Sequence, residues 1–346
     1  QALLADQLLR PAVASAEAEL GRRNRLGCML AALLAAAAWE CDRPADAAAL
    51  LADRLDVLER GGLPECLLLA YRTLARLALA EGAEHRALEL LGALDAAGAA
   101  RVLPRLSIVS LVEQVILHAR RYRAQSCRDL CAQIDARLDD PALPQGELWR
   151  RRVDVLRDQA RAYAAIAAQD WRGALAPLVR ADELALQLKQ GRLHIELLGL
   201  RAFALDRCGE DARALLREAT DLAQAHGLRR VFADAHPDLD AWVRGQGEKD
   251  ARPAPSVGEP ALAPSPTPAA MPRPMITPGM VLTPKEREVL ELLARNLSNK
   301  EIGNAMQVGE TTIKWHVKNL FAKLDAGSRK QVVQRARILG LMGEGG

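Results

Sequence analysis

Residues 282–341 read LTPKEREVLELLARNLSNKEIGNAMQVGETTIKWHVKNLFAKLDAGSRKQVVQRARILGL. The apolar residues in this stretch recur at the three- and four-residue spacing of amphipathic helices, and three short breaks interrupt them. The pattern predicts four helices joined by short turns, which is the organisation of a small helix-turn-helix domain.

Two of these helices begin with a capping box, in which a Ser or Thr and a Glu three residues later bond to each other's backbone N–H. Thr283 and Glu286 form the first, with Pro284 at the first helical position, and Ser298 and Glu301 form the second. We therefore expect helices to begin at these two places.

The third helix is predicted to follow Gly309 and to have one apolar and one polar face. The apolar face carries Ile313, Val317, Leu320, Phe321 and Leu324. The other face carries Thr311, Lys314, Trp315, Lys318 and Ala322. Lysines one turn apart, beside a hydroxyl and an aromatic ring, suit a helix in the major groove of DNA, although charged residues also line ordinary solvated faces.

Positive charge is concentrated in this stretch. Residues 281–341 contain eleven Lys or Arg and six acids, a net charge of +5, whereas the whole chain is +3 and the remainder therefore −2. Six of the eight lysines also lie here. This distribution favours contact with a phosphate backbone.

Four blocks, LTPKEREVLELLA, LSNKEI, TTIKWHVKNLFAKL and SRKQVVQRA, resemble in order and spacing the LuxR-type (GerE- or NarL-type) DNA-binding domain of bacterial transcription regulators. The resemblance covers about a sixth of the chain. It implies a third helix that reads the major groove and a fourth that supports dimer formation. The family's base and phosphate contacts fall on Lys314, Trp315 and Lys318, and its backbone contacts on Asn299, Lys300 and Thr311.

The stretch departs from the family pattern at a few positions. Gly309 stands in place of a Ser, and Gly303 replaces an Ala inside the second helix, which costs about 1 kcal/mol unless something compensates. Asp325 and Ala326 stand where a Gly and an apolar β-branched residue are usual, so we expect a looser turn. His316 has two interpretations: a phosphate contact or pH switch, and a histidine at the helix packing boundary.

Residues 1–243 are predicted to form an all-α array of helical hairpins. Aromatic residues make up only 3% of the chain, and Ala, Leu and Arg, which are strong helix formers, are abundant. Five helices begin with a small residue at intervals of 39, 40, 47 and 38: Ala48, Ala87, Cys127, Ala174 and Ala212. A polar turn precedes each one: ECDRPAD, AEGAEHR, ARRYRAQS, AQDWRG and DRCGED. The array resembles tetratricopeptide repeats, at a period longer than their 34 residues.

Residues 244–280 are predicted to be a flexible linker, because nine of the eighteen prolines fall between Pro253 and Pro278. A proline-rich peptide ligand is a weaker interpretation. The helix-turn-helix domain is assigned to residues 281–342 and a tail to 343–346. A tether of this kind lets two DNA-binding domains reach two half-sites.

Nothing in the sequence predicts a membrane span, since the apolar run 26–39 is too short and reads as a buried helix. The chain opens on Gln1 in the middle of a helical pattern, so we interpret it as the C-terminal part of a longer protein. LuxR-type domains on such arrays occur in large ATP-dependent regulators with an N-terminal ATPase. This chain has no GxxxxGK[ST] motif, so we assign it no nucleotide or other cofactor.

No set of residues in the array has the spacing of a catalytic or metal site. The best pairs are His194 with Glu196, and His236 with Asp234 or Asp238. The six cysteines include no CxxC, so we interpret them as small apolar residues, although Cys127 and Cys131 share a helix face. His85, His118 and His226 are expected at helix ends as C-terminal caps. Five aromatic residues either line a concave binding face or belong to the core: Tyr71, Tyr122, Trp149, Tyr163 and Trp171.

The sequence predicts a cytoplasmic bacterial transcription regulator that is not an enzyme and binds double-stranded DNA. We expect a dimer or higher oligomer on DNA, with RNA polymerase and an inducer or protein partner of the array as further partners. The alternative is a scaffold that recruits a protein partner and has only nonspecific affinity for DNA. The response half of a phosphorelay is a third class, but no alternating strand pattern indicates a receiver domain.

Overall fold

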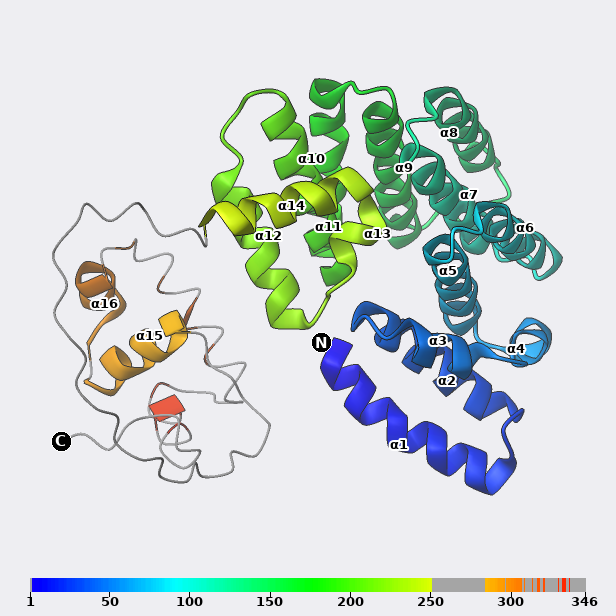
Figure 1. Ribbon diagram of the computed structural model, residues 1–346, viewed down its shortest axis with the longest axis horizontal. Helices are drawn as coiled ribbons and strands as arrows, with labels where there is room; N and C mark the ends of the chain where they lie inside the picture. Colours follow the sequence, from blue (N-terminus) through cyan, green and yellow to red (C-terminus); the bar gives the residue numbers. More distant parts are fainter. Residues whose placement is uncertain are drawn as a thin grey trace, which may run out of the picture. The chain divides into compact units, whose positions relative to one another are not determined.

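The computed structural model (Figure 1) describes residues 2–250, 284–295 and 297–306, together with positions 308, 313, 316, 317, 320, 329, 332, 333 and 336. The chain divides into two compact units, Gln1–Val257 and Gly258–Gly346. Every element in the described residues is a helix, and none is a strand. The all-α fold class predicted from the sequence is therefore confirmed.

The first unit contains fourteen helices within its described residues. They are α1 (Ala2–Leu20), α2 (Arg25–Glu40), α3 (Pro44–Leu51), α4 (Leu55–Gly61), α5 (Pro64–Ala80), α6 (Glu84–Ala100), α7 (Pro104–Ala119), α8 (Ala124–Leu138), α9 (Glu147–Ala167), α10 (Trp171–Gln187), α11 (Gly191–Arg207), α12 (Arg213–His226), α13 (Val231–Ala235) and α14 (Pro237–Asp250). Local chemistry fixes several starts: Pro44, Pro64 and Pro104 open α3, α5 and α7, and the Asn24 side chain caps α2.

Successive helices pack as hairpins, the arrangement predicted for the array. Each of the five predicted polar turns contains one residue with positive φ: Asp42, Gly82, Tyr122, Gln169 and Gly209. These residue numbers differ by 40, 40, 47 and 40, so the repeat is more regular than the helix starts indicated. In every turn the next residue donates its N–H to the carbonyl five residues back, for example Arg43 to Ala38 at 2.9 Å. This bond closes the helix end and needs the left-handed residue before it.

The structure corrects the register of the first hairpin by one residue. Ala47 is buried and Ala48 is exposed. Counted from Ala47, positions four, seven and eleven residues on are Leu51, Arg54 and Leu58, all buried. Arg54 therefore occupies a core position, where its guanidinium donates to the Gly27 carbonyl and pairs with Glu17. The helix also breaks here, because Asp53 has a φ of +57° and separates α3 from α4.

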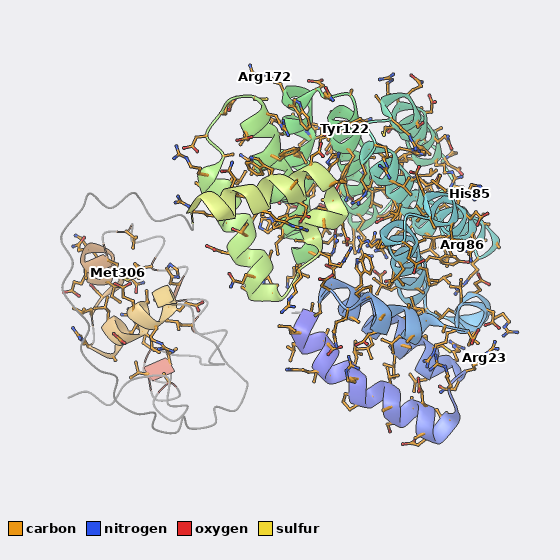
Figure 2. All side chains as sticks on the ribbon, viewed as in Figure 1. Arg23, His85, Arg86, Tyr122, Arg172 and Met306 are labelled. Atoms are coloured by element: carbon orange, nitrogen blue, oxygen red, sulfur yellow. The ribbon has the colours of Figure 1, made fainter. Side chains whose placement is uncertain are left out.

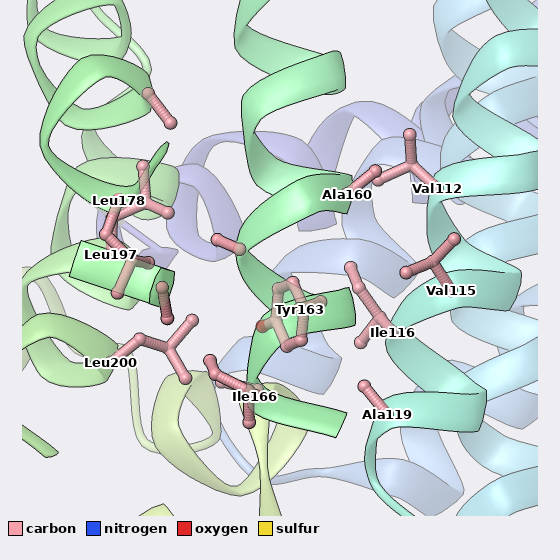
Figure 3. Packing of buried hydrophobic residues seen from close by; sticks show 14 of the residues in the cluster. Val112, Val115, Ile116, Ala119, Ala160, Tyr163, Ile166, Leu178, Leu197 and Leu200 are labelled. Carbon is pink, nitrogen blue, oxygen red and sulfur yellow. The ribbon is translucent and has the colours of Figure 1, made fainter. Parts of the chain in front are cut away.

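Two large apolar clusters fill most of the array, and α7 contributes to both. The first extends from Cys28 in α2 to Leu117 in α7, and the second from Ile108 in α7 to Leu239 in α14. Figure 3 shows part of the second cluster, in which Val112, Val115, Ile116 and Ala119 of α7 face Ala160, Tyr163 and Ile166 of α9, with Leu178, Leu197 and Leu200 on the other side. Helix α2, predicted as a buried helix over residues 26–39, belongs to the first cluster.

Helix α14 continues to Asp250, so its last residues fall inside the range predicted as linker. The rest of the predicted linker lies outside the described residues. None of the helices that the structure describes is long and apolar enough to span a membrane.

Candidate nucleic-acid interface

The second unit is built on α15 (Pro284–Ala294) and α16 (Asn299–Met306), which follow the two predicted capping boxes. Its apolar core contains residues from all four predicted helical segments: Val289, Leu290, Leu293, Ile302, Ile313, Val317, Leu320, Val332 and Ala336. Because each segment contributes to one core, the four segments form a single small domain.

The third segment places its predicted apolar residues inward. Ile313 and Leu320 are fully buried and Val317 is 8% exposed, and their spacing of four and three is that of one helix face. Phe321 and Leu324 lie outside the described residues, as do Thr311, Lys314, Trp315, Lys318 and Ala322 on the predicted outer face. The outward orientation of that face therefore stays a prediction. His316 is helical and half-buried.

The second capping box is present as predicted. The Ser298 N–H donates to the Glu301 carboxylate at 2.7 Å, and the Glu301 N–H donates to the Ser298 hydroxyl oxygen at 3.3 Å. The hydroxyl also donates to the carboxylate at 2.6 Å. These bonds from the Ser298 side chain and backbone lower the pKa of Glu301. In the first box, Glu286 is buried within α15, and Thr283 lies outside the described residues.

The capping box places Asn299 and Lys300, two of the predicted backbone contacts, in the first turn of α16. Lys300 is exposed and Asn299 is half-buried. The Asn299 side-chain oxygen accepts a hydrogen bond of 2.7 Å from the Arg329 guanidinium. This contact joins the start of α16 to the fourth segment.

Arg329 was not among the predicted site residues. It belongs to the block SRKQVVQRA, which carried part of the family resemblance, so its basic side chain was visible in the sequence. Its hydrogen bond to Asn299, 30 positions away, could not be predicted from the sequence, because that bond depends on how the segments pack.

Gly303 lies in the middle of α16 and is buried. Its carbonyl accepts the N–H of Val308 at 2.9 Å, a bond that closes the end of the helix. Gly309, Asp325 and Ala326, the other departures from the family pattern, lie outside the described residues.

The catalytic pairs considered in the array are not formed. His194 bonds to Asp182 at 2.5 Å, whereas Glu196 is buried and accepts from Tyr163 at 2.8 Å. The N–H of Asp238 donates to His236 Nδ1, and His236 Nε2 lies 3.3 Å from the Ala119 carbonyl, so the ring is a neutral structural group. The described residues contain no group of three His, Cys, Asp or Glu side chains that could hold a metal.

The remaining candidates in the array occupy structural positions. Tyr71 and Tyr163 are buried in the core, and the other three aromatic side chains are half-buried. His118 and His226 lie in the last turns of α7 and α12, as expected of C-terminal caps. The prediction is wrong for His85, which lies in the first turn of α6 and not at a helix C-terminus. Figure 2 shows it at the surface beside Arg86.

Comparison with known proteins identifies the class of the second unit. Residues 280–336 match the family described as bacterial regulatory proteins, luxR family. The chain therefore carries a LuxR-family helix-turn-helix domain, as the four sequence blocks indicated.

Similar proteins include the HTH-type transcriptional regulators MalT of Vibrio cholerae, Yersinia pestis and Yersinia pseudotuberculosis. Each is 44% identical over 63 residues, which is 18% of this chain and 7% of the relative. The similarity thus spans a small fraction of these relatives' length. No solved structure matches the chain.

Proposed function

We propose that this chain is a transcription regulator that binds double-stranded DNA through its C-terminal domain. The observation that carries the proposal is the family match over residues 280–336, together with the burial of Ile313, Val317 and Leu320 on one helical face. With those three residues inward, the 3.6-residue period assigns the basic positions between them to the other side of the third helix. The MalT relatives, which are named as transcriptional regulators, support the same function.

In this proposal the third helix enters the major groove, with Lys314 and Trp315 at base edges and Lys318 at a phosphate. Thr311, Asn299 and Lys300 contact the backbone of the duplex. The hydrogen bond from Arg329 orients Asn299 for that contact. The excess of eleven basic over six acidic residues in 281–341 supplies the nonspecific attraction to phosphate.

We assign the helical array a sensing or oligomerising role, with an inducer or protein partner as its ligand and RNA polymerase as a partner of the regulator. Binding as a dimer would present two recognition helices to two half-sites. The chain acts by binding and not by catalysis, has no cofactor of its own, and works in the cytoplasm, where the chromosome is accessible.

Selection of duplexes from a random pool by the purified chain tests the proposal. A sequence-specific regulator enriches one motif, and Lys314→Ala or Trp315→Ala shifts the preferred bases, each base contact being worth about 1–3 kcal/mol. If the pool stays random while the chain still retains DNA, the specific function is wrong. That result would favour the alternative function, a scaffold with only nonspecific affinity for DNA.

A further inference from the structure

The two ends of the array meet, although they are far apart in the sequence. The end of α2 lies against α13, and the backbone N–H of Arg229 donates to the Glu40 carbonyl at 2.9 Å. Figure 1 shows the helices of the first unit following an arc whose N-terminal part returns toward its last helices. The array is therefore closed into a ring, with a seam between α2 and the α11–α13 region.

Five side chains, here called the seam latch, join the two sides of this seam: Trp39, Glu40, Arg76, Arg192 and Asp234. The Trp39 indole N–H donates to the Asp234 carboxylate at 2.8 Å. The Arg192 guanidinium pairs with Glu40 and lies 3.2 Å from Asp234. Arg76 reaches the same two carboxylates, at 3.3 Å from Glu40 and 3.4 Å from Asp234.

A further pair stands at the rim of the seam. Arg230 lies 2.7 Å from the Asp42 carboxylate, and its guanidinium carbon lies 4.0 Å from the centroid of the Trp39 ring. This geometry combines an ion pair with a cation–π contact. The rim pair is partly exposed, whereas Glu40 and Asp234 inside the seam are almost fully buried.

Neither of the two large apolar clusters of the array crosses the seam. Among the described residues, the first apolar cluster has no member after Leu156, and the second has none before Ile108. Neither cluster therefore crosses from α2 to α13. The hairpins are held together along the chain by apolar packing. The ring is closed mainly by charges and hydrogen bonds, with the Leu3 side chain of α1 against Gly227 at the end of α12 as an apolar contact.

A closure made of buried charges is a weak net source of stability, because desolvation of the charges offsets most of their attraction. One oxygen of Glu40, Oε2, has no hydrogen-bond partner. A small, partly open pocket of about 30 Å³ lies beside the latch and is lined by Arg76, Arg120 and Asp234 among others. That volume has room for water, which can solvate the latch charges when they separate.

We propose that the array is a two-state ring, which opens along this seam while its hairpins stay folded. In the closed state the latch residues pair across the seam. In the open state water solvates the latch residues. Helix α13 then moves away from the end of α2, and the hydrogen bond from the Arg229 N–H to the Glu40 carbonyl is broken. The proposal concerns the array alone and does not depend on DNA binding.

Hydrogen exchange of the full chain, followed by mass spectrometry, tests the proposal. Asp234→Asn keeps the shape of the side chain but removes the charge that Arg76 and Arg192 share. We expect exchange of the amides of α13 and of residues 40–43 to rise on the order of 100-fold, as for a buried pair that loses one partner. The amides in the interior of α9 and α10 should keep their wild-type rates, and the radius of gyration in solution scattering should increase.

The matched control is Asp95→Asn, which breaks the Arg137–Asp95 pair between neighbouring hairpins and should leave α13 unchanged. Wild-type rates in α13, or one uniform increase over the whole array, would overturn the proposal. If Asp234→Asn does not fold, Arg230→Gln decides the question, because it removes the rim pair with Asp42, the cation–π contact with Trp39 and a longer ion pair of 3.6 Å with Asp234 while leaving the other latch side chains in place. Arg230→Gln should raise exchange of the amides of α13 and of residues 40–43 by a smaller factor than Asp234→Asn. Wild-type rates at these amides would contradict the proposal that the seam opens while the hairpins stay folded.

Discussion

Removal of the Ser298 hydroxyl tests whether the capping box stabilises the first turn of α16. In Ser298→Ala the Glu301 N–H loses its acceptor at 3.3 Å, and the carboxylate loses the hydroxyl donor at 2.6 Å. Loss of a helix N-cap costs about 1 kcal/mol, which is about a fivefold change in an opening equilibrium. We therefore expect the amides of residues 300–306 to exchange about fivefold faster at neutral pH.

Hydrogen exchange of the full chain measures this directly, with peptides from α9 as the internal reference. Ser298→Thr retains the cap and should stay close to wild type. If Ser298→Ala leaves exchange in α16 unchanged, or if Ser298→Thr raises it equally, the capping argument fails. Faster fraying should also weaken DNA binding, because Asn299 and Lys300 lie in the first turn of this helix.

The cap also has a pH dependence whose sign follows from Glu301. Bonds from Ser298 lower the pKa of this carboxyl below its ordinary value of 4.5, so the folded domain binds the proton less readily than the unfolded chain. The Glu301 carboxylate therefore contributes its full share to the stability of the domain above the ordinary pKa. This share is lost as the pH falls through the lowered pKa of the folded state. The difference in stability between wild type and Ser298→Ala should accordingly shrink in acid.

Three further predictions concern the array. Ala47→Leu should overpack the first hairpin and lower the free energy of unfolding by about 1–3 kcal/mol. Ala48→Leu, at an exposed position, should change it by less than about 0.5 kcal/mol. Urea titrations measure both, and a larger loss in Ala48→Leu than in Ala47→Leu would refute the corrected register. Burial lowers the pKa of His236, so the unfolded chain takes up the proton first and stability should fall from pH 7.5 to 5.5, with a smaller fall in His236→Gln by thermal unfolding. Burial raises the pKa of Cys127 to about 12 and of Cys131 to about 11, so iodoacetamide at pH 8 should label both only after unfolding, and rapid labelling of the native chain would contradict this.

Features with a local cause could be predicted from the sequence. The Ser298–Glu301 cap and the five hairpin turns depend on residues a few positions apart, and the structure contains all of them. The inward positions Ile313, Val317 and Leu320 follow from helical period alone. The register of α3 could not be chosen in the same way, because the run PADAAALL offers several alanines of equal hydrophobicity.

Features that depend on the curvature of the array could not be predicted. Arg54 is charged yet fully buried, because Asp53 breaks the helix and the Gly27 carbonyl and the Glu17 carboxylate accept hydrogen bonds from its guanidinium. The contact between Trp39 and Asp234 spans 195 residues, and no spacing in the sequence indicates it. Residues 244–250 at the end of α14 fall inside the predicted linker, because that linker is assigned from the prolines that follow them.

The salt dependence of duplex binding by Lys318→Ala tests the central claim, that the basic side of the third helix contacts DNA. Each phosphate contact contributes about −0.9 to the slope of log affinity against log salt concentration. The account predicts weaker binding to every duplex and a slope shallower by about one such contact. Lys189→Ala, which removes an exposed lysine of the array, is the matched control and should keep the wild-type slope. Wild-type affinity and slope in Lys318→Ala would contradict the account.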